Sequence, residues 1–189
     1  MRSPSNSASG GLVASSPRIG VGAPAPDFTL KRIDGSEVNL ASFRGKRPVI
    51  LVFASYTCDV FRDQQTLIEL VYDQFKEHAE FFLVYIREAH PSGGWVIPEN
   101  ELRGISIKDP KSYSQRVAVA TTACEELRLK LPCLIDGADD AISDAYLAWP
   151  VRIVLMDADG KIAVLSSQNP VSFAPTILKA REWLKKLKV

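Results

Sequence analysis

The sequence is poor in cysteine, with 3 in 189 residues, and no two of them form a C-x-x-C pair. An odd number without that spacing argues against a disulfide framework and against a zinc site. We therefore predict no bound metal and no bound cofactor. The same scarcity favours a reducing compartment, so we expect a cytoplasmic protein with one working thiol.

A strong charge of one sign and a long apolar run are also missing. The net charge is +1, which argues against a nucleic-acid surface or a membrane-steering field. No apolar segment approaches the ~20 residues of a membrane span, so we expect neither nucleic acid nor membrane as a partner. Residues 1–20 are rich in serine and should form a disordered tail without a signal peptide. Residues 21–189 are long enough to form a single domain with its own core.

The most informative stretch is Pro48 to Phe61, which reads PVILVFASYTCDVF. Val49 to Phe53 is a short apolar run that is typical of a buried strand, and a helical pattern begins directly after Cys58. The free N–H groups and the dipole of a helix start favour a thiolate. We therefore predict that Cys58 is a nucleophile and the most reactive thiol of the chain, with a pKa below about 8.5. The alternative is a small buried hydrophobic residue.

A second buried strand is predicted for Phe81 to Ile86, after the helix that follows Cys58. Strand, helix and strand form a parallel unit, so the loop Arg87 to Pro98 should lie at the same edge of the sheet as Cys58. Glu88 and His90 lie in this loop. A histidine titrates near neutrality and can move protons, and a nearby carboxylate can fix its tautomer. The alternative is a solvated loop histidine.

The other two cysteines lie in predicted core elements. A helix from Pro110 places Cys124 on its inward stripe with Tyr113 and Val117, and Cys133 begins a short strand. We expect both to be buried and to be weak candidates for a resolving thiol. The closing helix, Val171 to Lys188, should direct Leu178 and its periodic partners inward.

Two segments resemble the iodothyronine deiodinase family. The residues from Phe53 to Phe61 resemble its Phe-Gly-Ser-x-Thr-selenocysteine-Pro-x-Phe pattern, with Cys58 replacing selenocysteine and Asp59 replacing proline. The loop from Glu88 to Trp95 resembles Glu-Ala-His-x-Ser-Asp-Gly-Trp, with glycine at the aspartate position. Cues of a peroxiredoxin-like hairpin precede them. The resemblance implies an α/β fold, a thioredoxin-like α/β/α sandwich with a central mixed sheet and an N-terminal β-hairpin extension.

The resemblance also implies a set of site residues. The predicted catalytic residues are Cys58, His90, Glu88, Thr57, Ser55 and Tyr85, and the predicted substrate-binding residues are Arg152, Trp95, Pro150 and Phe61. In such folds a cis-proline faces the active cysteine, and an arginine near it is implicated in holding the carboxylate end of the substrate. A solvent-facing strand arginine is the alternative for Arg152. The family's second histidine is missing, because no histidine stands between Trp95 and Cys124.

Three functions remain open on these residues. Attack of a thiolate on iodine gives a Cys–S–I intermediate and a dehalogenated product, whereas attack on a peroxide gives a sulfenic acid. A non-catalytic redox-sensing or binding module is the third. We expect a thiol-dependent oxidoreductase of deiodinase type that acts on a small molecule, an iodinated aromatic compound. Because no second cysteine lies in the helix turn after Cys58, the reductant should be an external thiol, a thioredoxin-type protein or glutathione. A homodimer is left open.

Overall fold

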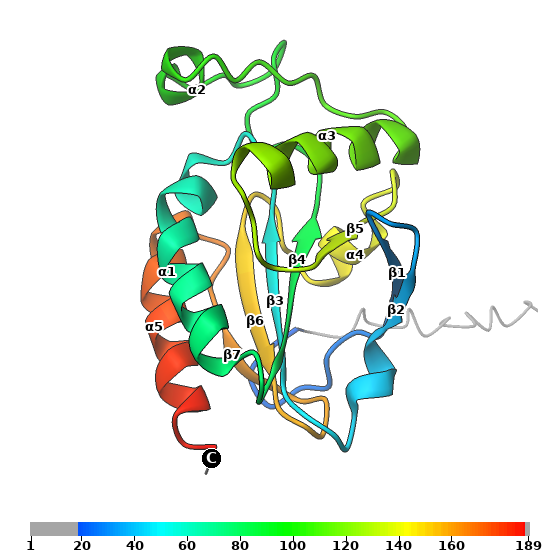
Figure 1. Ribbon diagram of the computed structural model, residues 1–189, viewed down its shortest axis with the longest axis vertical. Coiled ribbons are helices and arrows are strands. Elements are labelled where there is room, and N and C mark those ends of the chain that lie inside the picture. The colour runs from blue at the N-terminus through cyan, green and yellow to red at the C-terminus, as the bar shows by residue number, and fades with distance from the viewer. Residues whose placement is uncertain (1–18, 188–189) are drawn as a thin grey trace, which may run out of the picture.

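The computed structural model describes residues 19–187. A seven-stranded mixed sheet in the order β2-β1-β5-β4-β3-β6-β7 forms the centre, and helices lie on both faces (Figure 1). The predicted α/β architecture with a central mixed sheet is therefore confirmed. The predicted tail lies outside the described residues except for its last two positions, residues 19 and 20.

Two buried parallel strands form the middle of the sheet. β3 (Val49–Ala54) pairs in parallel with β4 (Glu80–Tyr85), and every residue of β3 is buried. A strand buried on both faces needs a nearly continuous apolar sequence, which is what Val49 to Phe53 provides. The flanking strands are β5 (Cys133–Ile135), parallel to β4, and the antiparallel pair β6 (Arg152–Met156) and β7 (Ile162–Leu165).

The predicted N-terminal hairpin is present at one edge. β1 (Thr29–Arg32) pairs antiparallel with β2 (Glu37–Asn39) and, on its other side, with β5. The turn is formed by Gly35, whose φ of 84° suits glycine, and by Asp34, whose carboxylate accepts the Ser36 N–H at 2.9 Å. The hairpin thus extends the sheet beyond β5.

Three helices cover one face of the sheet, and a smaller layer covers the other (Figure 1). The first face carries α1 (Asp59–Phe75), α3 (Tyr113–Glu126) and α5 (Phe173–Leu184). The second carries α4 (Ala141–Ala145) with the residues that follow it and the N-terminal segment. The short helices η1 (Leu40–Phe43), α2 (Pro98–Leu102) and η2 (Pro170–Ser172) lie in the connections.

Two predicted helix faces are wrong in part. The buried residues of α3 are Arg116, Ala120 and Ala123, whereas Tyr113 is exposed. Arg116 points inward because its guanidinium donates to the Gly137 carbonyl and forms an ion pair with Asp140 at 2.7 Å. A paired buried arginine is therefore added to the predicted stripe, of which Ala120 is buried and Val117, Cys124 and Leu127 pack against the core. In α5, Leu178 is 48% exposed.

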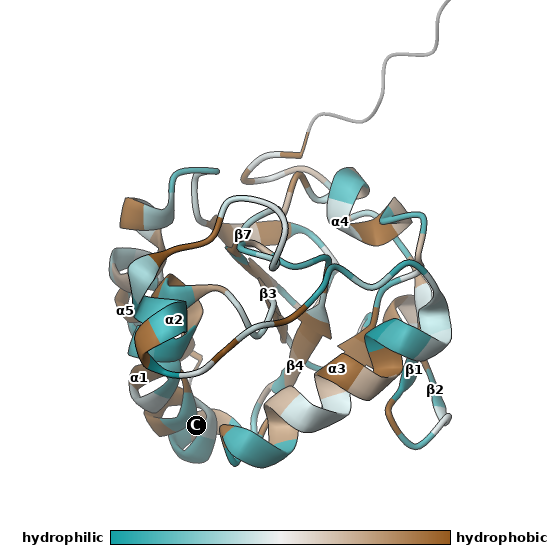
Figure 2. Cartoon of the chain, turned by 90° about the horizontal axis from the view of Figure 1, so that it is seen from above, coloured by the Kyte–Doolittle hydropathy of each residue, from teal (hydrophilic) through white to brown (hydrophobic). Residues whose placement is uncertain are grey.

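The carboxyl ends of β3 and β4 meet at one edge, as predicted. Ala54 and Tyr85 are in register at the ends of the two strands, and the chain continues to Cys58 on one side and to Glu88 on the other. Figure 2 views the molecule from this end. In both views α2 lies beyond the first turn of α1, although the sequence predicted no helix there (Figures 1 and 2).

Candidate functional site

Cys58 lies where the sequence predicts it, between β3 and α1. It is the N-cap residue of α1 with extended backbone angles, and its N–H donates to the Ser55 carbonyl at 3.2 Å. Its side chain faces the apolar core between α1 and the sheet, and the residue is only 1% exposed. Cys58 is therefore at a helix start, but it is covered.

The predicted low pKa of Cys58 is wrong for this conformation. Burial raises the pKa of Cys58 to about 11. The backbone N–H groups of Phe61 and Val60 and the guanidinium of Arg62 favour the thiolate, while the neighbouring Asp59 carboxylate disfavours it. The helix start acts in the predicted direction, but the loss of hydration of the thiolate outweighs it.

A buried hydrogen-bond network joins the Cys58 turn to the loop after β4. Glu88 is 3% exposed, and one of its carboxylate oxygens accepts both the Thr57 N–H, at 2.9 Å, and the Thr57 hydroxyl, at 2.6 Å. The other oxygen accepts the Tyr85 hydroxyl. The Tyr85 oxygen in turn accepts the Tyr56 N–H at 3.0 Å. Burial raises the pKa of Glu88, and these donors oppose the rise.

His90 contacts the same turn from the loop. Its backbone N–H donates to the Thr57 hydroxyl oxygen at 3.0 Å. Nδ1 lies 3.1 Å from the Trp95 carbonyl oxygen, which can only accept, so Nδ1 carries a proton. Nε2 is left as the proton-accepting atom and lies 3.8 Å from the Asp59 carboxylate. Asp59, which departs from the family pattern, therefore faces the predicted catalytic histidine.

Arg62 and Asn100 are site residues that sequence reasoning missed. Asn100, in α2, is fully buried, and its side-chain amide donates to the Thr57 carbonyl at 2.9 Å. Arg62 donates to the Tyr56 carbonyl and to the side-chain oxygen of Asn100. Together they tie α2 to the Cys58 turn. The partners lie 38 and 43 residues apart along the chain, so no local pattern indicated them.

Ser55 and Trp95 also belong to this region. Ser55 is fully buried, and its hydroxyl oxygen accepts the Ala89 N–H at 3.0 Å, a third link between the turn and the loop. Trp95 is 71% exposed, and its ring lies edge-on to the His90 ring, with centroids 4.8 Å apart. The structure thus brings together the six predicted catalytic residues and Trp95.

The other predicted substrate-binding residues lie differently. Pro150 follows a cis peptide bond, as predicted. Phe61 is buried in the core behind Cys58. Arg152 is directly opposite Phe53 in the sheet, on the α4 face, where its guanidinium donates to the Leu147 carbonyl at 2.7 Å. Arg152 is 5% exposed, so the solvent-facing alternative is wrong, and its role in substrate binding stays a prediction.

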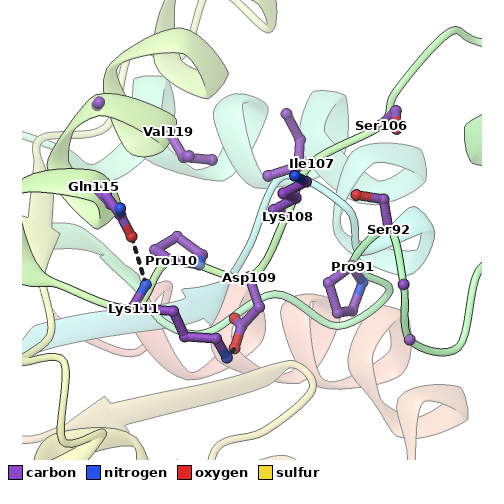
Figure 3. A pocket seen from close by; sticks show the side chains of 13 residues that line it. Pro91, Ser92, Ser106, Ile107, Lys108, Asp109, Pro110, Lys111, Gln115 and Val119 are labelled. Atoms are coloured by element: carbon purple, nitrogen blue, oxygen red, sulfur yellow. Dashed lines mark hydrogen bonds and ion pairs between the residues drawn. The ribbon is translucent and has the colours of Figure 1, made fainter.

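A cavity of about 770 Å³ lies on the outer side of the loop (Figure 3). Its wall consists of Pro91–Gly94, Ser106–Lys111, Gln115, Ala118 and Val119. The loop is fixed against the opposite wall by the Ser92 N–H, which donates to the Ile107 carbonyl at 2.7 Å. Asp109 connects the cavity to the network, because its carboxylate accepts the Glu88 N–H at 3.3 Å. The cavity therefore adjoins the His90 loop and is joined to the buried network through Asp109.

Residues 19–187 contain no group of three or more His, Cys, Asp or Glu side chains that could hold a metal ion. No helix in that range is both long and apolar enough to cross a membrane.

Comparison with known proteins matches most of the chain to one family. The model of the family described as iodothyronine deiodinase matches residues 11–188. A type II iodothyronine deiodinase of Sus scrofa is 31% identical over 159 residues, which are 82% of this chain and 58% of the relative. A thyroxine 5-deiodinase of Gallus gallus is 32% identical over 170 residues, 89% of this chain and 63% of the relative. The chain thus spans about three fifths of the length of these relatives.

Solved structures confirm the thioredoxin-like fold. The crystal structure of peroxidoxin BcpB from Mycobacterium tuberculosis superposes with a TM-score of 0.64 at 17% identity, covering 91% of this chain and 100% of that one. At that identity the likeness concerns the fold alone. The family is shown by the sequence match, which covers both the Cys58 segment and the His90 loop. This chain belongs to the iodothyronine deiodinase family.

Proposed function

We propose that this chain is a thiol-dependent oxidoreductase in which Cys58 removes iodine from an iodinated aromatic substrate. The observation that carries the proposal is the convergence of Glu88 and His90 on Thr57, the residue directly before Cys58. A histidine with one ring nitrogen fixed and the other available, bound to the residue that precedes a cysteine at a helix start, is an arrangement suited to nucleophilic catalysis.

The proposed reaction has three steps: removal of iodine by Cys58, release of iodide and reduction of Cys58. The Cys58 thiolate attacks the iodine, the carbon–iodine bond breaks, and the aryl carbon takes up a proton. The product is the dehalogenated ring, and the enzyme carries a Cys58–S–I group. A first external thiol displaces iodide from this sulfur, forms a mixed disulfide and loses a proton. A second external thiol then restores the Cys58 thiol and leaves as the oxidised disulfide of the reductant.

His90 is the proposed proton carrier. Because Nδ1 donates to the Trp95 carbonyl, Nε2 can accept a proton, and the resulting imidazolium faces the Asp59 carboxylate at 3.8 Å. The same atom can return the proton to the aryl carbon as the carbon–iodine bond breaks. Tyr85 has a different role, since burial raises the pKa of its hydroxyl well above the ordinary value. Tyr85 therefore keeps its proton and holds Glu88 and the Tyr56 N–H in place.

The substrate must reach a cysteine that is covered in this conformation. The cavity on the outer side of the His90 loop has a volume in the range typical of small-molecule sites. It is lined mostly by apolar side chains and backbone, with Lys108 and the ion pair between Lys111 and Asp109 on its wall. An aromatic substrate whose carboxylate meets Lys108 suits this lining. We propose that it binds there and displaces the loop so that its iodine meets Cys58.

The test is a turnover assay on the purified protein with a dithiol as reductant. Iodide release from iodothyronines and iodotyrosines is measured beside the consumption of hydrogen peroxide and an organic hydroperoxide. We expect iodide release that is lost in Cys58→Ser and kept in Cys124→Ser. Glutathione and a reduced thioredoxin then replace the dithiol in turn, to identify the class of reductant.

Two results would contradict the proposal. Peroxide consumption that depends on Cys58, without iodide release, would make the chain a thiol peroxidase that forms a Cys58 sulfenic acid. Turnover of neither substrate class would favour a redox-sensing or binding module that retains the fold.

A further inference from the structure

Residues 95–104, the lid segment, contain α2, which lies beyond the first turn of α1 (Figures 1 and 2). Within this segment Asn100 is fully buried and Ile97 is half-buried, whereas the other residues are exposed. Leu102, at the end of α2, is 88% exposed. A short helix that buries no apolar side chain gains little from packing. The position of the lid segment therefore depends on its polar contacts.

The side chain of Asn100 forms a clasp between the lid segment and the Cys58 turn. Its amide donates to the Thr57 carbonyl at 2.9 Å, and its oxygen accepts from the Arg62 guanidinium. The same guanidinium donates to the Tyr56 carbonyl, and the Arg62 backbone N–H donates to the Cys58 carbonyl at 3.3 Å. Asn100 and Arg62 therefore bind the carbonyls of the two residues that precede Cys58.

Two other contacts join the lid segment to its surroundings. Arg103 lies 3.8 Å from the Asp63 carboxylate, but both side chains are more than half exposed, and such ion pairs contribute little to stability. The Trp95 carbonyl accepts from Nδ1 of His90 at 3.1 Å. The position of the lid segment thus fixes the ring of His90 as well as the carbonyl of Thr57.

We propose that Asn100 and Arg62 are positioning residues of the proposed reaction and that they hold a lid, which opens to admit the substrate and closes for the chemical step. In the closed position Cys58 is 1% exposed and the His90 ring is fixed, so the reacting groups are arranged but covered. Segments with few buried apolar contacts open at the lowest cost. The lid segment also continues directly from the cavity wall at Gly94, so a substrate that displaces the wall displaces the lid.

The proposal deepens the proposed function and rests on it, but opening of the lid can be measured without a substrate. The first experiment times the reaction of Cys58 with iodoacetamide at pH 8 and reads it by peptide mass. Asn100→Ala should label Cys58 at least about tenfold faster than the wild type, because opening no longer breaks the clasp.

Ile162→Ala is the matched control for loss of stability. Ile162 is 1% exposed beside Met156, which is in register with Val49 at the opposite end of β3. The variant therefore weakens the core far from the lid segment. Its Cys58 labelling should stay within about twofold of the wild type, because a local opening does not involve that part of the core.

The second experiment uses the wild type and does not depend on the folding of Asn100→Ala. Labelling of Cys58 should hardly change with urea below the unfolding transition, because a local opening exposes little surface. Labelling of Cys133, which is 6% exposed in the apolar cluster, should rise steeply with urea, as global unfolding does. Equal urea slopes for the two thiols, or equal acceleration of Cys58 labelling in Asn100→Ala and Ile162→Ala, would overturn the proposal.

A third measurement separates positioning of the reacting groups from coverage alone. Single-turnover iodide release should fall by about tenfold in Asn100→Ala although its Cys58 is labelled faster, because the Thr57 carbonyl and the His90 ring lose their fixed positions. Iodide release that rises together with labelling would show that Asn100 is not a positioning residue. If the wild type releases no iodide, the proposed function fails, whereas the two labelling experiments still decide whether the lid opens.

Discussion

The Cys58 turn and the Cys124–Cys133 pair place cysteines at opposite ends of helices, and their properties are the reverse of what those ends favour. Cys58 begins α1, where the helix dipole stabilises a thiolate, yet burial raises its pKa to about 11. Cys124 lies near the end of α3, where the dipole opposes a thiolate, yet the interaction with Cys133 lowers its pKa. For the pKa of Cys58, burial therefore outweighs the effect of the helix dipole. For the pKa of Cys124, the interaction with Cys133 outweighs it.

The two regions also differ in how they are held. The Cys58 turn donates hydrogen bonds to Tyr85 and Glu88 and accepts them from His90, Arg62 and Asn100. Cys124 and Cys133 pack in the apolar cluster, and the Cys133 thiol donates to the Leu134 carbonyl at 3.8 Å. A converging polar shell is what a reaction with a bound substrate requires.

The largest expected effect is the loss of iodide release when Cys58, and not Cys124 or Cys133, is replaced. Cys58→Ser should lower iodide release by roughly 10³-fold or more, because the nucleophile is lost. Cys124→Ser and Cys133→Ser should stay within about twofold of the wild type, since α3 and β5 contribute no hydrogen bond to the Cys58 turn and β4 separates β5 from β3. Single-turnover rates without added reductant measure the chemical step alone. Equal losses in Cys58→Ser and Cys124→Ser would mean that the two regions act as one site.

His90→Ala should lower turnover by about 10²–10⁴-fold, the usual contribution of a positioned acid–base group. His78→Ala is the matched control, because His78 is the only other histidine and lies exposed beyond the end of α1. The pH dependence of turnover should change in the first variant and remain in the second. If both variants behave like the wild type across pH 5–9, His90 has no catalytic role.

The order of thiol modification tests the comparison directly. At pH 8 a thiol of pKa about 11 is ionised to only about 0.1%, so Cys58 should react slowly with iodoacetamide. Cys124 should be labelled at least about tenfold faster, because it is half-buried and its pKa is lowered. Timed labelling read by peptide mass decides the order. Faster labelling of Cys58 would show that the closed turn opens readily in solution.

Asn100→Ala should reduce the free energy of unfolding by about 3 kcal/mol, because two buried groups lose their partner, the Thr57 carbonyl and the Arg62 guanidinium. Asn39→Ala is the control, since the Asn39 amide bonds the Thr29 hydroxyl at an exposed site and should change stability by less than about 0.5 kcal/mol. Urea unfolding followed by circular dichroism gives both values. Similar small changes in the two variants would show that α2 is not tied to the turn.

The smallest expected effect is the pH dependence of stability at Cys58. The folded pKa, about 11, lies above the unfolded one, so the stabilising contribution is complete below the unfolded pKa and is lost as pH rises toward 11. Between pH 8 and pH 11 the wild type should lose about 2 kcal/mol more than Cys58→Ser does. Chemical unfolding at both pH values measures the difference, and parallel losses in the two proteins would contradict the raised pKa.

The amino-acid sequence alone determined the frame of the site. The apolar run from Val49 to Phe53 and the helical period after Cys58 specify β3 and α1, because a strand buried on both faces and an amphipathic helix each need one kind of pattern. The parallel connection then places the loop with Glu88 and His90 at the same edge as Cys58. The motifs within those two segments identified the family that the comparisons confirm.

The tertiary structure alone decided the chemical state of the three thiols and the partners of the turn. Burial and hydrogen bonding sum over atoms from distant segments, as in the bond from Asn100 to Thr57. The periodicity of apolar residues along the sequence does not indicate which distant residues lie next to each other. It could not show that Cys58 is covered, that Arg116 is buried in α3, or that Arg152 points to the α4 face.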